Sequence, residues 1–244
     1  MKLLAFVFSL LCFGISGVAA KEIMVGMGNF APYFIEKGNT GIFGDLITAV
    51  FRHMPDHQPR FLFGLPTKRL WLEFKMGRID AAPLPDSLES AGCRTDQIFQ
   101  FFNVAIVKVN AKLEINNISD LAGKRIVAFQ GAKKVFGTEF TKLTEFGSYT
   151  ELANQNTQAK MLIIDRVDVS VGDMFIFLQT LKDIKNQSVT PKDFAFYHIF
   201  PPAYRRMGFR DIEMCAPFNK ALKQVHQSGE YERIYDSYLK RLSD

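Results

Sequence analysis

Cysteine, histidine and tryptophan are scarce in this sequence, with three, four and one copies among 244 residues. His53 and His57 have the spacing of helical metal ligands, but Pro55 between them breaks the helix they would need. The G-x-S-x-G motif of serine hydrolases and the H-E-x-x-H motif of zinc proteases are missing. We therefore expect no metal or other cofactor, and no enzyme of these two classes.

Long runs of one charge sign are also absent. The formal net charge is +5, and lysine and arginine are spread along the chain instead of forming a basic tract. An ordinary solvated surface explains this distribution, so we expect no nucleic-acid partner.

A long apolar run occurs only near the start, where "LLAFVFSLLCFGI" follows Lys2 and small residues at Val18 and Ala20 offer a cleavage site. This pattern predicts a secretory signal peptide over residues 1–20. The run is shorter than the about 20 residues that span a bilayer, and a retained N-terminal anchor is the alternative. We therefore expect an exported chain that begins at Lys21.

Removal of this leader takes away Lys2 and Cys12, so the net charge becomes +4 (+5 minus one) and Cys93 and Cys215 remain. An exported compartment permits a disulfide between them. A bridge also requires a suitable Cα separation, which a sequence does not contain, so the pairing stays open at this point.

Short apolar β-type runs alternate with segments of helical period. The strand candidates are "EIMVGM", "RFLFG", "IDAAPL", "RIVAFQG" and "VDVSVG". The helix candidates are "GDLITAVFRHM", "TKRLWLEFKMG", "KVFGTEFTKL", "NTQAKMLIID" and "DMFIFLQTLKDI", followed by two C-terminal helices broken at Ser228-Gly229. This alternation predicts an α/β fold with largely parallel sheets.

Two internal similarities suggest that the α/β unit occurs twice. "WLEFKMGRIDAAP" (71–83) resembles "KMLIIDRVDVSVG" (160–172), because each has an apolar helix end, Arg-Ile/Val-Asp and a strand of small residues. "KEIMVGMGNF" (21–30) likewise resembles "GKRIVAFQGA" (123–132). Two lobes would explain both, and chance similarity between α/β units is the alternative.

The stretch "VGMGNFAPYF" contains G-x-G-x-x-A directly after an apolar run, as a dinucleotide-binding loop does. Such a loop must open a helix, but Pro32 disfavours a helical Ala31 and turn residues follow. We instead expect a strand-exit loop that places Phe30 and Tyr33 on the wall of a cleft, with the apolar core as the alternative for either ring.

The order of these motifs resembles the family 3 extracellular solute-binding proteins, the periplasmic polar-amino-acid binders of ABC uptake systems. The matching pieces are "VGMGNFAPYF", "GIFGDLITAVF", "LPTKRLWLEFKMGRIDAAP", "ISDLAGKRIVAFQGA", "DRVDVSVGDMFIFL" and "FNKALKQVHQSGEYERIYDSYL". The resemblance covers essentially the whole chain after residue 20. It implies a type II periplasmic-binding-protein fold with two lobes joined by two crossing hinge strands.

The implied boundaries follow from the crossings, which we expect near "FFNVAIVKV" and "FAFYHIFP". The first lobe would comprise residues 21–104 and 201–244, and the second lobe residues 105–200. The resemblance further implies a monomer in the periplasm that captures a small polar solute, such as an amino acid, for a membrane permease.

The resemblance also implies which two charged residues of this chain would bind the carboxylate and the ammonium of an amino acid. Arg94 matches the arginine that binds the carboxylate, a role that suits its planar, bidentate guanidinium, and a surface ion pair is the alternative. Asp173 matches the acid that binds the ammonium, and it also precedes an apolar helix, where a capping role is typical. Both roles of Asp173 can coexist.

Further ligand contacts are implied at the ends of strands. The amides of Gly131 and Ala132, at a helix start, would face the ligand carboxylate. Ser87 lies in a loop where the family supplies polar contacts, and Trp71 would line the cleft or pack in its helix. Ala91 and Ala132 stand where the family usually has hydroxyl residues, which predicts a different ligand or lost binding.

We expect a binding protein and not an enzyme, and two other functions are kept as alternatives. One is an enzyme on the same scaffold, since the family includes dehydratase-like members and a cleft carboxylate can act as a base. The other is a periplasmic sensor that acts in trans on a membrane partner.

Overall fold

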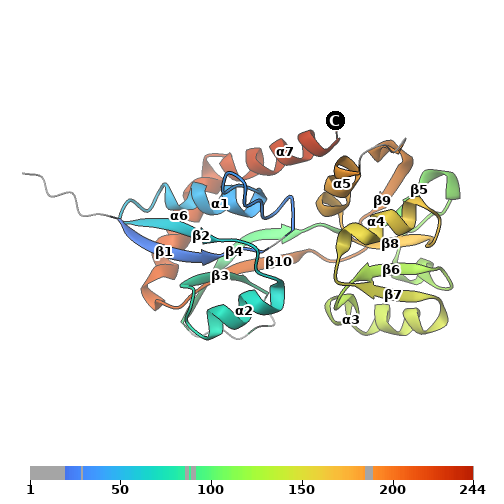
Figure 1. Ribbon diagram of the computed structural model, residues 1–244, viewed down its shortest axis with the longest axis horizontal. Helices are drawn as coiled ribbons and strands as arrows, with labels where there is room; N and C mark the ends of the chain where they lie inside the picture. Colours follow the sequence, from blue (N-terminus) through green and yellow to red (C-terminus); the bar gives the residue numbers. More distant parts are fainter. Residues whose placement is uncertain (1–19, 29, 86–87, 89–91, 185–188, 244) are drawn as a thin grey trace, which may run out of the picture.

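The computed structural model describes residues 20–28, 30–85, 88, 92–184 and 189–243, and Figure 1 shows two lobes side by side. Each lobe contains one five-stranded sheet with helices packed against it. The chain crosses from the first sheet to the second at Phe102 and returns over residues 198–202. The expected two-lobe α/β architecture with two crossings is therefore confirmed.

The first sheet has the strand order β2-β1-β3-β10-β4. Its strands are β1 (Lys21–Gly26), β2 (His57–Leu62), β3 (Ala81–Leu84), β4 (Cys93–Phe101) and β10 (Ala203–Phe209). β1 is parallel to β2 and β3, whereas β10 is antiparallel to β3 and β4. Parallel strands end at the same edge of a sheet, so the loops after β1 and β3 lie together.

The second sheet has the order β7-β6-β8-β5-β9. Its strands are β5 (Asn103–Lys108), β6 (Ile126–Phe129), β7 (Tyr149–Leu152), β8 (Val169–Asp173) and β9 (Phe194–Tyr197). β6 is parallel to β7 and β8, whereas β5 is antiparallel to β8 and β9. The second sheet therefore has the same sequence of parallel and antiparallel neighbours, from one edge to the other, as the first sheet.

The repeated Arg-Ile/Val-Asp pattern has the same structural role in both lobes. The carboxylate of Asp80 accepts a hydrogen bond from the amide of Met24 at 2.8 Å. The carboxylate of Asp168 accepts one from the amide of Arg125, also at 2.8 Å. Each aspartate thus fastens the strand that it begins to the neighbouring central strand, and the two predicted units are confirmed as structural repeats.

Helices cover both sheets. Those of the first lobe are α1 (Ile42–Phe51), α2 (Thr67–Lys75), α6 (Cys215–Gln227) and α7 (Glu230–Ser243), and those of the second are α3 (Ala132–Leu143), α4 (Gln155–Ile163) and α5 (Met174–Asp183). Short 3-10 turns occur at Val109–Ala111, Ile118–Leu121, Thr144–Phe146, Pro191–Asp193 and Ile212–Met214. None of the helices in the described part of the chain has the length and apolar character that a membrane crossing needs.

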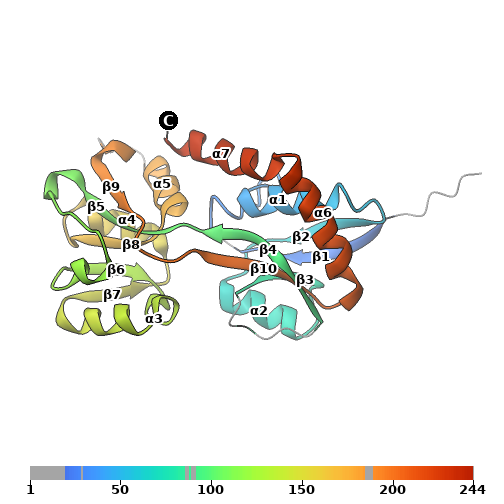
Figure 2. The same ribbon diagram turned by 180° about the vertical axis from the view of Figure 1, so that it is seen from behind.

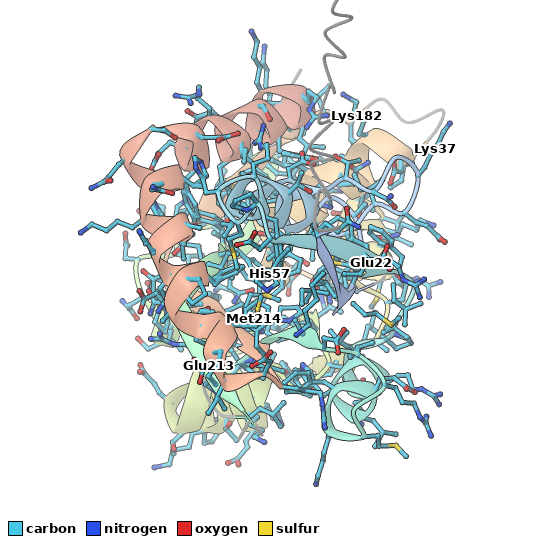
Figure 3. The ribbon with its side chains drawn as sticks, turned by 90° about the vertical axis from the view of Figure 1, so that its left-hand side faces the viewer. Glu22, Lys37, His57, Lys182, Glu213 and Met214 are labelled. Atoms are coloured by element: carbon cyan, nitrogen blue, oxygen red, sulfur yellow. A yellow bond between two sulfur atoms is a disulfide. The ribbon has the colours of Figure 1, made fainter. Side chains whose placement is uncertain are left out.

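The C-terminal helix α7 extends from the first lobe to the second, as Figures 1 and 2 show. The ring of Tyr235 on α7 lies 6.0 Å from that of Phe175 on α5 and 5.7 Å from that of Phe102, measured between centroids. The ammonium of Lys182 on α5 donates to the carbonyl of Arg241, and Figure 3 places Lys182 near the end of α7. Helix α7 thus joins the lobes in addition to the two crossings.

A disulfide joins Cys93, the first residue of β4, to Cys215, the first residue of α6. The Cα atoms lie 6.1 Å apart, and the cysteines are 122 positions apart in the sequence. The bridge therefore ties the C-terminal helices to the edge of the first sheet and settles the pairing that the sequence left open.

Replacement of both cysteines by serine is expected to lower the free energy of unfolding by about 2–4 kcal/mol, because the bridge closes a long loop in the unfolded chain. Urea denaturation followed by circular dichroism measures the change. Wild-type protein unfolded with a reducing agent should match the double variant. An unchanged midpoint would show that the bridge does not stabilise the fold.

Candidate ligand site

A pocket opens at the edge of the first sheet where β1 and β3 end, and its empty space, with the solvent at its open mouth included, is about 350 Å³. Its walls are mainly aromatic, and its lining residues are Gly28, Phe30, Phe34, Leu70, Trp71, Pro83, Phe99, Phe101 and Arg205. Phe101 is the last residue before the crossing at Phe102, so the pocket borders the hinge. A site at the carboxyl ends of parallel strands is where α/β sheets usually bind ligands.

The G-x-G-x-x-A stretch shapes this wall. A Cβ atom on Gly28 would lie 2.6 Å from the ring of Phe34, so a glycine is needed for that ring to pack there. The ring of Phe30 contacts Phe34 edge-on at 4.8 Å and Phe101 at 5.9 Å between centroids. Phe30 therefore lies on the wall of the pocket, as the sequence predicted. Gly28, the second glycine of the motif, makes room for the ring of Phe34.

Arg205 adds the charged part of the pocket lining. Its guanidinium carbon lies 4.8 Å from the centroid of the Phe101 ring, within the range of a cation–π contact. Its Nη1 atom donates to the carbonyl of Tyr204 at 2.9 Å. Sequence reasoning missed this residue, since "AYRR" acquires its position only when β10 returns beside β4.

Arg94 lies near the start of β4, where it faces Gly208 across the strand pair. Its Nη1 atom donates to the carbonyl of Pro85 at 3.1 Å, just beyond the end of β3. The guanidinium thus extends toward the edge of the sheet where the pocket lies, although Arg94 is not among the pocket's lining residues. The expected contact between Arg94 and a ligand carboxylate stays a prediction.

Asp173 is buried between the lobes, with 3% of its surface exposed. Its Oδ2 atom accepts hydrogen bonds from the Tyr33 hydroxyl at 2.8 Å and the Phe102 amide at 2.7 Å. Its Oδ1 atom accepts one from the amide of Ile176 at 3.0 Å, which caps α5 as the sequence predicted. Burial raises the pKa of Asp173 to about 6, against the opposing effect of these hydrogen bonds.

Tyr33 lies behind the pocket wall and is fully buried. Its ring contacts those of Phe101, Phe99 and Phe175 at 4.8, 5.7 and 6.2 Å between centroids. Burial, reinforced by the charge of Asp173, raises the pKa of the Tyr33 hydroxyl well above its usual value, so it stays a proton donor. Tyr33 thus contacts Phe175 and Asp173 of the second lobe. Its ring lies in the apolar core, which was the alternative to a position on the cleft wall.

Asp173 also borders a narrow gap between β8, α4 and α5, whose empty space, open solvent included, is about 190 Å³. Gln155, Gln158 and Ser170 give this gap a polar lining. The amide nitrogen of Gln158 is buried there and has no hydrogen-bond partner among the described residues. The second lobe therefore offers polar groups beside its acid, in contrast to the aromatic wall of the first lobe.

The turn before α3 binds a carboxylate of the protein itself. Glu151, on β7, accepts hydrogen bonds from the amides of Gly131 at 2.7 Å and Lys133 at 3.2 Å, and from the hydroxyl of Tyr149 at 2.8 Å. Partial burial raises the pKa of Glu151, but these hydrogen bonds outweigh it and lower the pKa. Ala132 is buried.

The structure brings together only some of the sequence-predicted site residues. Phe30 and Trp71 line the pocket, whereas Tyr33 and Asp173 bond to each other behind it. Ser87 lies outside the described residues. A ligand contact stays a prediction for each of the eight, which are Phe30, Tyr33, Trp71, Ser87, Arg94, Gly131, Ala132 and Asp173.

Comparisons with known proteins show similarity at the level of structure. No family model matches the sequence, and no curated protein does. The GluR0 ligand-binding core, solved with L-glutamate, has 14% identity and a TM-score of 0.71 over 91% of this chain and 99% of its own.

Two transport proteins are similar in the same way. The substrate-binding protein AbpA of an amino acid ABC transporter from Streptococcus pneumoniae, bound to L-arginine, has 16% identity and a TM-score of 0.69 over 91% of this chain and 96% of its own. ArtJ from Geobacillus stearothermophilus, an arginine-, lysine-, histidine-binding protein, has 22% identity and a TM-score of 0.62 over 92% and 100%. The resemblance to solute-binding proteins is thus confirmed for the fold.

The raised pKa of Asp173 predicts a specific dependence of stability on pH. The folded state favours the protonated acid, so Asp173 contributes most below its unfolded pKa of about 4, and this contribution is lost as pH rises through about 6. Relative to Asp173→Asn, the wild-type free energy of unfolding should fall by up to about 3 kcal/mol between about pH 4 and about pH 7. Urea titrations at a series of pH values measure both proteins, and parallel curves would contradict the prediction.

Proposed function

We propose that this protein captures a small polar solute, of about the size of an amino acid, between its two lobes and presents it to the membrane permease of an ABC transporter. The observation that carries this proposal is the pocket beside the hinge, with aromatic walls and the guanidinium of Arg205. Its position at the strand ends, next to the crossing at Phe102, would allow one molecule to contact both lobes once they close.

Closure follows from this geometry. The lobes are joined at Phe102, over residues 198–202 and through α7, which allows them to rotate while each sheet stays intact. A solute that contacts both lobes binds the closed form more tightly than the open form and so shifts the population toward it. The permease would recognise the closed form.

The fold supports a transport role, because the AbpA and ArtJ structures with the same architecture are named as amino-acid-binding proteins. The expected leader over residues 1–20 would export the chain to the periplasm, where such a protein meets its permease. In this proposal the protein acts without chemical change to the solute. Mass spectrometry of the bound solute, recovered unchanged after incubation, would distinguish binding from an enzymatic role.

The GluR0 ligand-binding core favours a second candidate, since its fold is also similar to that of this chain. A sensor would use the same cleft and the same closure, but would present the closed form to a signalling partner. Pull-down from solubilised membranes with and without solute separates the two, because the partner recovered is a permease in one case and a receptor in the other.

Trp71 provides a direct test of binding, because it is the only tryptophan in the sequence and it lines the pocket. A solute that enters the pocket should change the fluorescence of Trp71. Phe30→Ala should weaken binding by about ten-fold or more, since an aromatic wall is lost.

The matched control is Phe146→Ala, which removes a ring that is 76% exposed on the second lobe and should leave the affinity unchanged. Titration of a panel of amino acids and small organic acids measures these constants. If no compound alters the fluorescence or the calorimetric signal of folded wild-type protein, the binding function is wrong.

A further inference from the structure

Gln158 on α4 has a polar group to which the described part of the chain offers no partner. Its side chain is buried, since 3% of the residue's surface is exposed. Among the described residues, its amide nitrogen has no hydrogen-bond partner. Buried polar groups in native proteins are nearly always bonded, either to another protein group or to an ordered water molecule, because an unbonded one loses its hydration without compensation. A water molecule is therefore the first candidate for the partner of Gln158.

The elements around Gln158 use their own polar groups elsewhere. Strand β8 lies between β5 and β6 and is bonded to both. On α5, the hydroxyl of Thr180 lies 2.9 Å from the side-chain oxygen of Asn156 and 2.8 Å from the carbonyl oxygen of Ile176. The carboxylate of Asp173 accepts hydrogen bonds on both of its oxygen atoms. Gln158 instead borders the gap between β8, α4 and α5.

The gap exists because β8 has a glycine at this point. A Cβ atom on Gly172 would lie 3.0 Å from Oε1 of Gln158 and 3.6 Å from Oε1 of Gln155, so both carboxamides lie over Gly172. Ser170 comes two residues earlier on the same strand and therefore lies on the same face of the sheet, where it also lines the gap. Three polar side chains thus surround a position where the strand has no side chain.

The size and the lining of the gap decide what fits in it. The centre of a water molecule can occupy a volume of about 10 Å³ there, which is room for about one water. An amino acid or another solute of that size is too large for this space. An internal water usually has about two to four polar partners, and two carboxamides and one hydroxyl offer that number.

We propose that this gap is a binding site for one structural water molecule, which accepts a hydrogen bond from the amide of Gln158 and is held by the hydroxyl of Ser170 and the carboxamide of Gln155. The water joins α4 to β8 at the point where β8 ends in Asp173, the acid that is bonded to the first lobe through Tyr33. It belongs to the second lobe and lies outside the aromatic pocket, so this inference does not rest on the proposed function.

Contacts between water and protein protons test this site in solution. In a rotating-frame Overhauser experiment, the side-chain amide protons of Gln158 should show a cross-peak to water with the sign of a dipolar contact, which is opposite to that of proton exchange. Gln158→Met keeps an unbranched side chain without the amide, and it assigns the signal. A crystal structure of wild-type protein should show one water within hydrogen-bond distance of Nε2 of Gln158 and the hydroxyl of Ser170.

Gly172→Ala tests how the space arises. The added Cβ atom would enter the gap, so the cross-peak and the water density should both be lost. The matched control is Gly44→Ala in α1 of the first lobe, whose Cβ atom would make ordinary contacts at 3.4 Å with the Asn39 carbonyl oxygen and should leave both signals unchanged. Ser170→Ala adds no atom and serves if Gly172→Ala does not fold, and it should weaken the cross-peak because the water loses one partner.

Folded wild-type protein with neither the cross-peak nor the density would overturn this inference. A metal cation at this position, or a direct hydrogen bond from Gln158 to another side chain, would overturn it as well. A water that persists unchanged in folded Gly172→Ala would overturn the role assigned to Gly172. Each of these outcomes leaves the proposed function intact, since the solute panel tests a different pocket.

Discussion

The hydrogen bond between the Tyr33 hydroxyl and the Asp173 carboxylate joins the two lobes where the chain crosses between them. Its partners are 140 residues apart in the sequence and 2.8 Å apart in the structure. The same carboxylate binds the amide of the crossing residue Phe102 and caps α5. One buried acid therefore sets the position of a first-lobe loop, a crossing strand and a second-lobe helix, in surroundings where water does not compete.

The ligand pocket depends on this arrangement through its immediate neighbours. Phe30 and Phe34 flank Tyr33 in the loop after β1, and both line the pocket. Phe101, which supports the guanidinium of Arg205, precedes the residue whose amide binds Asp173. The pocket wall is thus formed at its front by aromatic rings and held at its back by the hydrogen bonds of Asp173 to Tyr33 and Phe102.

Roles that depend on neighbouring residues could be predicted from the sequence. Asp173 precedes an apolar helix, and it caps that helix. Pro32 follows the glycine motif, and no helix starts on that loop, since α1 begins at Ile42. The repeated Arg-Ile/Val-Asp pattern indicated two similar units because each aspartate acts within its own unit.

Roles that depend on distant strands could not be predicted in this way. Glu151 reaches the turn at Gly131 only because β7 lies beside β6, and Arg205 reaches Phe101 only because β10 returns beside β4. The sequence resemblance assigned Gly131 and Asp173 to a ligand, while it contained no sign that Glu151 and Tyr33 lie next to them.

The contact of helix α7 with the second lobe has a consequence for movement of the lobes. Helix α7 rests on α5, so the lobe rotation proposed above would displace Tyr235 against Phe175 and break the hydrogen bond from Lys182 to the Arg241 carbonyl. The proposed closure would therefore include a shear along the α5–α7 pair, so the contact area of these two helices sets how far the lobes can turn.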